Sequence, residues 1–340
     1  MAAHRGISPA IDAHLDVRGR GYDGQFFLAI ALDPVRARHY VDAPQYRYSH
    51  ILYPMLARAL ALGRNAWIPA ALILVNLIAV GVGTFCVATL LARSGLPPAL
   101  AALYFLFPGL LTAYAEDLSE PLAYGLAALG LLLLAGWRGP RRVAGAAAVF
   151  ALAGLTRETT LLIAVTVAVI HVAGAPRETG RLRRASGFAA IAVLPYVAWR
   201  VFLIAWLGST ASHPGLTVGV IPFSGLIKAT TLDKWPIIGV ALPAAALGAA
   251  CLLRLRSGWR NETFAALCVS LLVLAVYLPS ESYRAYESAG RLQIGAVLLA
   301  LLSLRTLRTR RTEPLLAGVG LVAYLPLLPL ALTLARTGYP

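Results

Sequence analysis

The first residue suited to chemistry is an aspartate enclosed by glycines. It lies in the run Gly21-Tyr22-Asp23-Gly24-Gln25, which precedes the apolar residues Phe26–Leu32. Glycine allows a tight turn and a close approach to a ligand, and a carboxylate can accept a proton from an attacking hydroxyl. Asp23 is therefore a candidate general base. The alternative is that Asp23 caps a helix beginning near Gln25.

A basic and aromatic group follows. Its members are Tyr46-Arg47-Tyr48-Ser49-His50 and Leu52-Tyr53-Pro54. The guanidinium of Arg47 offers a fork of donors that matches a phosphate, so Arg47 is a candidate anion ligand. Tyrosine and arginine together are also typical of a segment anchored among lipid headgroups, and that alternative stays open.

Three carboxylates, those of Glu116, Asp117 and Glu120, lie close together between two apolar segments. Ser119 and Pro121 are typical of a helix start, but capping a helix needs only one such polar group. The density of carboxylates therefore favours a functional role for this second acidic loop.

Further charges are more scattered. Arg157 and Glu158 occupy a short turn between two apolar segments and can neutralise each other. Arg200 lies short of the end of its own apolar segment, where a charge must pair, extend to the membrane surface or bind an anion. Arg291 follows a polar stretch at residues 280–287.

The elements that position these residues are predicted from composition. The chain has 340 residues, of which 59% are hydrophobic and 13% charged, whereas a soluble domain is about a quarter charged. We expect an all-α, polytopic transmembrane bundle of about ten spans, with short interfacial helices at Phe26–Leu32 and Ile51–Leu62. The apolar segments are residues 67–91, 97–114, 119–137, 143–157, 158–175, 185–207, 236–253, 261–279, 291–305 and 313–335.

The net charge of +15 has a topological explanation. Arginines crowd into alternate connections and acidic residues into the opposite ones, which places the arginine-rich connections on the cytoplasmic side. No nucleic-acid partner is therefore needed to explain the charge. Only two of the thirty basic residues are lysines, and this arginine-rich usage, typical of GC-rich codons, favours a multi-pass protein of a bacterial inner membrane. The three cysteines form no disulfide or zinc pattern.

This topology divides the chain into an outer N-terminal region, residues 1–66, and a transmembrane domain, residues 67–340. It places residues 1–66 outside although no spanning segment precedes them. We expect that an upstream first helix is missing from this chain. The alternative is that the N-terminal region is cytoplasmic and the number of spans differs by one.

The polar motifs together resemble those of the GT-C class of polytopic membrane glycosyltransferases. Within that class the chain is similar to the mannosyltransferases that use dolichyl-phosphate sugars, over roughly residues 20–300. The motifs that carry the resemblance are Gly21-Tyr22-Asp23-Gly24-Gln25-Phe26-Phe27, Tyr46-Arg47-Tyr48, Leu52-Tyr53-Pro54, Glu116-Asp117 with Ser119-Glu120, and Thr156-Arg157-Glu158.

The resemblance implies an enzyme that moves a sugar from a polyprenyl-phosphate donor to a hydroxyl of a glycan, lipid or protein on the non-cytoplasmic face. Asp23 matches the catalytic base, although the family has a spanning helix before it. Glu116, Asp117 and Glu120 match the assisting acidic loop. The candidate ligands of the lipid phosphate and the substrates are Arg47, Arg157, Arg200, Arg291, His50, Gln25 and Tyr22.

The sequence also bears on other classes of protein. No P-loop, GxGxxG opening a βαβ unit, HExxH or GxSxG motif is present, which disfavours nucleotide, zinc-peptidase and serine-hydrolase chemistry. A divalent cation, Mg²⁺ or Mn²⁺, between Asp23 and the second acidic loop is compatible with the pattern but not required. The alternatives are a transporter or lipid flippase, which usually has charges near the bilayer midplane, and a non-catalytic GT-C-like membrane protein.

Overall fold

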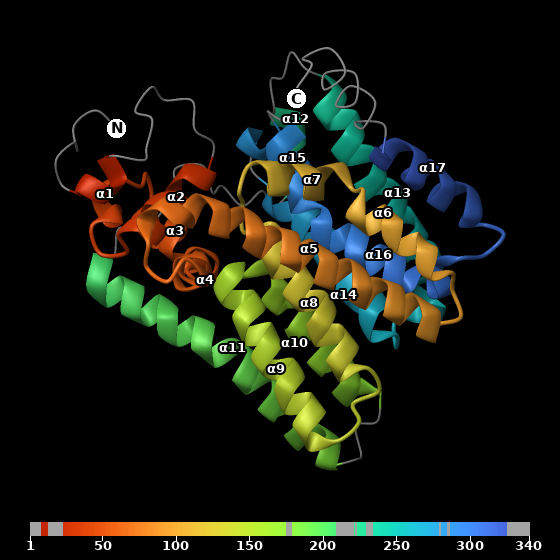
Figure 1. Cartoon of the computed structure of the whole chain (residues 1–340). Helices are drawn as coiled ribbons and strands as arrows, with labels where there is room; N and C mark the ends of the chain where they lie inside the picture. Colours follow the sequence, from red (N-terminus) through yellow and green to blue (C-terminus); the bar gives the residue numbers. More distant parts are fainter. Residues whose placement is uncertain are drawn as a thin grey trace. The chain divides into compact units, whose positions relative to one another are not determined.

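A computed structural model describes residues 8–12, 23–174, 179–208, 221, 223–228, 234–278, 280–283 and 286–324, and in them all regular structure is helical (Figure 1). The all-α prediction is therefore confirmed. Internal contacts divide the chain into two compact units. The first is Met1–Cys86, Ala113–Val165 and Leu182–His213, and the second is Val87–Thr112, Thr166–Arg181 and Pro214–Pro340.

The first unit begins with short helices: α1 (Pro9–Asp12), α2 (Gly24–Leu32), α3 (Pro44–Arg47) and α4 (Leu52–Leu60), with 3-10 turns at Ala37–His39, Tyr48–His50 and Asn65–Trp67. Helices α2 and α4 confirm the two short helices expected from the apolar pattern. They pack together through Phe27 and Tyr53, whose rings lie 5.4 Å apart. Arg58 of α4 donates to the carbonyls of Ala31 and Leu32, which satisfies the C-terminal end of α2.

Longer apolar helices complete the first unit: most of α5 (Ile68–Arg93), then α8 (Glu120–Leu134), α9 (Pro140–Thr156), the first turns of α10 (Thr159–Ala173) and most of α11 (Thr179–Leu207). Helices α8 and α9 form an antiparallel hairpin (Figure 1). Gly125 of α8 lies so close to α5 that an added Cβ would be 2.6 Å from the carbonyl oxygen of Ala79. A small residue at this point permits the close approach of the two helices.

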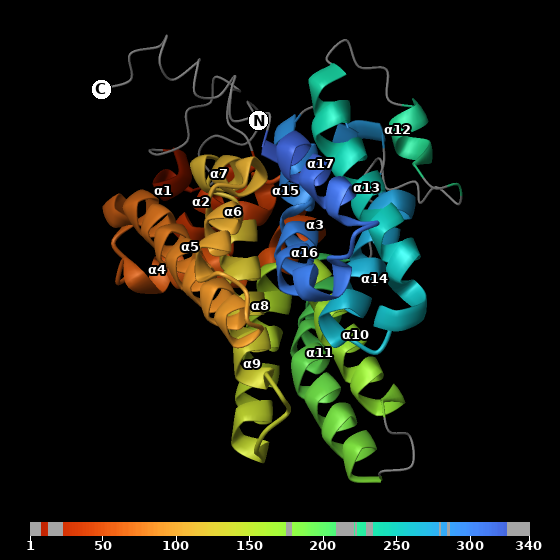
Figure 2. The same cartoon turned by 90° about the vertical axis from the view of Figure 1, so that its right-hand side faces the viewer.

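The second unit contains α6 (Ala101–Phe105), most of α7 (Pro108–Ala115), α12 (Ser224–Lys228), α13 (Lys234–Gly258), α14 (Glu262–Tyr277), α15 (Tyr286–Leu292), α16 (Ile294–Leu307) and α17 (Glu313–Tyr324), with 3-10 turns at Pro98–Leu100 and Ser280–Tyr283. Helix α13 packs against α14, α16 and α17 (Figure 2). The amide of Gln293 donates to the carbonyl of Val240 at 3.0 Å, so this buried polar group is satisfied.

Three helical stretches within the described residues are long and apolar enough to cross a membrane: Asn65–Arg93, Gly180–Leu207 and Gly239–Gly258. A fourth is counted if Pro98–Phe105 and Pro108–Ala115, which meet at 50°, form one span. The predicted segment 97–114 is therefore broken, because Pro108 lacks the N–H that would continue the helix. Each of the other predicted segments also contains a helix, but several are short: α8, with 15 residues, rises only about 22 Å.

Candidate functional site

Asp23 sits at the N-terminus of α2, but its side chain makes no capping hydrogen bond. The capping alternative is therefore wrong. Instead, Oδ1 of Asp23 lies 2.9 Å from Nη2 of Arg47. The side chain of Asp23 remains 22% exposed, so the carboxylate is oriented by an arginine and still accessible.

Arg47 is shared between two carboxylates. Its Nε and Nη2 bind the two oxygens of Asp42 at 2.8 and 3.0 Å, in addition to the contact with Asp23. The side chain is only 7% exposed, and its guanidinium lies 4.2 Å from the ring centroid of Phe26. Burial opposes the charge, but Asp42 and Asp23 outweigh it and raise the pKa of Arg47 above its ordinary value. In this structure Arg47 is thus a ligand of carboxylates and positions Asp23.

The two acidic loops meet at Gly24. A Cβ atom on this residue would overlap the carbonyl oxygen of Glu116 and lie 3.2 Å from the Cβ of Asp117. Only glycine permits this contact, which brings the turn that carries Asp23 against the turn that carries Glu116 and Asp117. The glycine beside Asp23 therefore has a packing reason that the sequence pattern alone did not reveal.

Asp117 has the most unusual environment of these carboxylates. Its backbone is in the left-handed region, with φ of +51°, a conformation that non-glycine residues seldom adopt outside turns and functional sites. Its Oδ1 is buried and has no hydrogen-bond partner within the described residues. Burial, and then the charge of Glu116, raise the pKa of Asp117 to about 6. This carboxyl group can therefore exchange a proton near neutral pH.

Asn76, which lies within helix α5, hydrogen-bonds to the second acidic loop. Its side-chain amide donates to the carbonyl of Leu118 and to the hydroxyl of Tyr53, both at 2.9 Å. Sequence analysis missed Asn76, although it is the sole asparagine in an otherwise apolar helix. It also missed Asp42, whose signal was its position five residues before Arg47.

Glu120 and Arg157 form a buried ion pair. Oε1 of Glu120, whose side chain is 1% exposed, lies 3.1 Å from Nη1 of Arg157. The two residues neutralise each other. Two of the predicted site residues therefore have a structural role that needs no substrate. Arg157 was expected to neutralise its neighbour Glu158, but Glu158 has another partner.

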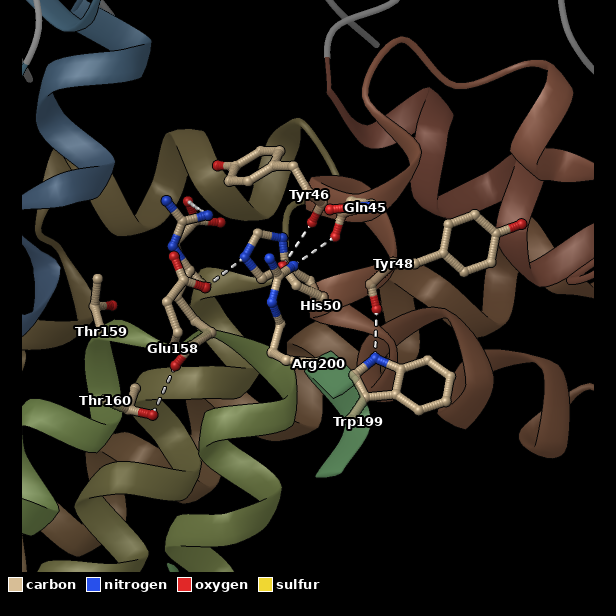
Figure 3. A network of polar contacts seen from close by, with 12 residues as sticks. Gln45, Tyr46, Tyr48, His50, Glu158, Thr159, Thr160, Trp199 and Arg200 are labelled. Atoms are coloured by element: carbon tan, nitrogen blue, oxygen red, sulfur yellow. Dashed lines mark hydrogen bonds and ion pairs between the residues drawn. The ribbon is translucent and has the colours of Figure 1, made fainter. Parts of the chain in front are cut away.

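That partner is His50, whose Nε2 lies 2.8 Å from Oε2 of Glu158 (Figure 3). The histidine is buried, and its ring packs edge-on against Tyr46 at 5.0 Å. Glu158 lies in the turn between α9 and α10. Burial would raise its pKa, but His50 and then Arg157 outweigh that effect and lower it.

Helix α11 donates two side-chain hydrogen bonds to the backbone of the segment around Arg47. The indole of Trp199 donates to the carbonyl of Tyr48 at 2.7 Å, and Nη1 of Arg200 donates to the carbonyl of Gln45 at 2.9 Å (Figure 3). Arg200 is half-buried, and no ion pair to a carboxylate is observed for it among the described residues. Of the candidate arginines in the first unit, Arg200 is the one for which the described part of the chain shows no carboxylate partner.

The structure says less about the roles of the other predicted site residues. Gln25 is in the first turn of α2, beside Asp23, and Tyr22 lies outside the described residues. Arg291 is in α15, which belongs to the second unit. No group of three or more His, Cys, Asp or Glu side chains suited to a metal ion occurs in the described part of the chain.

The arrangement offers an oriented carboxylate, a second carboxyl group with a raised pKa and an arginine without a carboxylate partner, all within the first unit. Such a set can remove a proton from a hydroxyl and bind an anionic leaving group. No family model, curated protein or solved structure matches the chain. The function therefore has to be argued from the residues themselves.

Proposed function

We propose that the protein is a GT-C-type membrane glycosyltransferase. It has about ten spans in a bacterial inner membrane and moves a sugar from a polyprenyl-phosphate donor to an acceptor hydroxyl on the non-cytoplasmic face. The observation that carries the proposal is the contact of the two acidic loops at Gly24, next to Asp23. Two turns that carry carboxylates lie in contact at this glycine. This arrangement favours a role in proton transfer over a merely structural role for either turn.

Asp23 is the general base in this proposal. The acceptor oxygen attacks the anomeric carbon, its proton passes to the Asp23 carboxylate, and the bond between that carbon and the lipid phosphate breaks. Arg47, 2.9 Å from Asp23, keeps the carboxylate in one orientation. Asp117, with its pKa of about 6, assists as a second proton acceptor, and Glu116 shares its turn.

Arg200 is the ligand of the donor phosphate in this proposal. The leaving group gains negative charge, and an arginine not neutralised by a carboxylate can stabilise it. An aromatic stripe of α11 lies alongside, with Phe202 stacked on Trp199 at 5.1 Å and on Trp206 at 5.8 Å. The neighbouring side chain of Val201 is exposed. This apolar face suits a prenyl chain that enters from the bilayer.

The test is sugar transfer by the reconstituted full chain, with a panel of polyprenyl-phosphate sugars and a labelled sugar as readout. We expect Asp23→Asn to lower the transfer rate at least about 100-fold, as expected for loss of a general base, while expression and membrane insertion stay normal. The matched control is Asp42→Asn, which removes the other carboxylate on Arg47 but no proposed base. Undiminished transfer by Asp23→Asn would refute the assignment, and equal losses in both variants would reduce Asp23 to a structural partner of Arg47.

A further inference from the structure

The end of α9 opposite to Arg157 borders a cavity within the first unit. Its volume is about 580 Å³, and it lies between the start of α9 and the N-terminal half of α11. Since α9 has 17 residues, about 25 Å of helix separates this cavity from Arg157. The cavity is therefore distinct from the proposed transfer site.

The cavity has apolar walls. Trp137, Val143, Phe188 and Ile191 line it. The rings of Trp137 and Phe188 are 5.3 Å apart, and Phe150 packs edge-on against Phe188 at 5.8 Å from the other side. These contacts pack the aromatic lining of the cavity against the rest of the first unit.

Its rim is positively charged. Arg183 and Arg184 line the cavity itself. We call these two, together with Arg138, Arg141 and Arg142, the arginine cluster; all five are exposed, and no hydrogen bond or ion pair to them occurs within the described part of the chain. A concentration of positive charge without carboxylate partners is complementary to an anion.

An apolar surface leads away from the cavity along α11. Only 17% of the apolar stretch of this helix is buried inside the structure. Ile191 lines the cavity and is exposed, and Leu194, Val197 and Val201 are also exposed at helical spacing beyond it. This surface is suited to contact with acyl chains.

We propose that the cavity binds an anionic phospholipid of the cytoplasmic leaflet. The lipid phosphate binds Arg183 and Arg184, the glycerol end packs against Trp137 and Phe188, and an acyl chain follows α11. The arginine-rich connections are predicted to be cytoplasmic, where anionic lipids and basic pockets between helices combine. A soluble anion would not use the apolar walls, and a zwitterionic lipid would not need the unpaired arginines.

The test measures lipid binding to the purified full chain in neutral detergent by native mass spectrometry. The probes are dioleoyl phosphatidylglycerol, dioleoyl phosphatidylcholine and inorganic phosphate. We expect phosphatidylglycerol to bind at least about tenfold more tightly than phosphatidylcholine, and the double variant R183Q/R184Q to lose about 10- to 30-fold in phosphatidylglycerol affinity. The matched control R310Q/R311Q removes the same charge from an exposed pair outside the cavity and should change the affinity less than twofold.

A second pair of variants tests the cavity without changing charge. A Cβ on Gly187, which lines the cavity, and one on Gly145, which does not, both meet open space. We expect Gly187→Leu to lower phosphatidylglycerol affinity several-fold and Gly145→Leu to leave it unchanged. The proposal is overturned if the control variants lose as much as the cavity variants, or if inorganic phosphate competes as well as the lipid does.

Discussion

Arginines stand at both ends of α9, in opposite environments. At the C-terminal end Arg157 is buried and pairs with Glu120, next to the pair of His50 and Glu158. At the N-terminal end Arg141 and Arg142 are exposed, and no partner is observed for them within the described residues. A guanidinium removed from water requires a carboxylate, whereas an exposed one keeps its hydration and can exchange it for a ligand. The C-terminal end of α9 thus contributes a buried ion pair to the fold, whereas the N-terminal end keeps guanidinium donors available for a ligand.

The same contrast occurs between two arginines near the proposed transfer site. Arg47 is held by Asp42 and Asp23, so it positions a carboxylate. Arg200 binds only the carbonyl of Gln45 in the contacts observed, so it has donors for a phosphate. The five arginines of these two comparisons look alike in sequence, but they divide according to whether a carboxylate already neutralises them.

The largest expected effect comes from removing Arg157. Arg157→Ala leaves Glu120 charged in a buried site, which should lower the free energy of unfolding by about 3–5 kcal/mol. Arg142→Ala at the other end of the same helix should change it by no more than about 0.5 kcal/mol. Denaturant unfolding in detergent measures both, and similar values for the two variants would remove the basis of the comparison.

A double variant sharpens this test. Replacing Arg157 by Met and Glu120 by Leu leaves no buried charge without a partner. We expect it to regain much of the stability lost in Arg157→Ala, because buried ion pairs are costly to desolvate. If the double variant stays as unstable as the single one, the pair contributes through its shape and hydrogen bonds rather than through charge neutralisation.

The next effect is a pH dependence from Asp117. Because its folded pKa is about 6, above the ordinary value of 3.8, the folded state holds the proton more tightly than the unfolded state does. The resulting stabilisation is complete below about pH 4 and is lost as the pH rises through about 6. It amounts to at most about 3 kcal/mol. Asp117→Asn, which tolerates the left-handed backbone, should remove this trend from unfolding measured at pH 4 to 7.

Asp42 supplies a control of opposite sign. Burial opposes the shift, but Arg47 outweighs it and lowers the pKa of Asp42. Its stabilisation is therefore present above about pH 4 and is lost as the pH falls through its folded pKa. Asp42→Asn should lower the free energy of unfolding above about pH 4 and reduce its fall in acid, without altering the trend between pH 4 and 7. An unchanged trend in Asp117→Asn would refute the assignment of that trend to Asp117.

The smallest effect is expected at Arg200. Arg200→Gln should raise the KM for the polyprenyl-phosphate donor about tenfold, with a smaller rise for Arg200→Lys, because lysine keeps the charge but loses the fork of donors. The fold should be nearly unaffected, since only one hydrogen bond to a carbonyl is lost. A variant that loses stability but keeps its KM would show that Arg200 only anchors the segment around Gln45.

Local pattern predicted most of the longer helices. Apolar runs predicted α2, α4, α5 and α11 closely, because helix formation and apolar periodicity depend on near neighbours in the chain. The break between α6 and α7 was missed although Pro108 is visible in the sequence, since hydropathy averages over a single residue. Glu116, Asp117 and Glu120 were found by their local density and Asp23 by its flanking glycines, whereas Asp42 and Asn76 have no such signal and were missed.

By itself, the amino-acid sequence determined that this protein is helical and that its charged residues gather in short connections. Tertiary structure decided which charges neutralise each other, as Glu120 with Arg157 and His50 with Glu158. It also decided that Gly24 brings the two acidic loops into contact and that an apolar cavity lies behind Arg183 and Arg184. The reason is physical: helix formation depends on neighbours in sequence, whereas burial and charge pairing depend on neighbours in space.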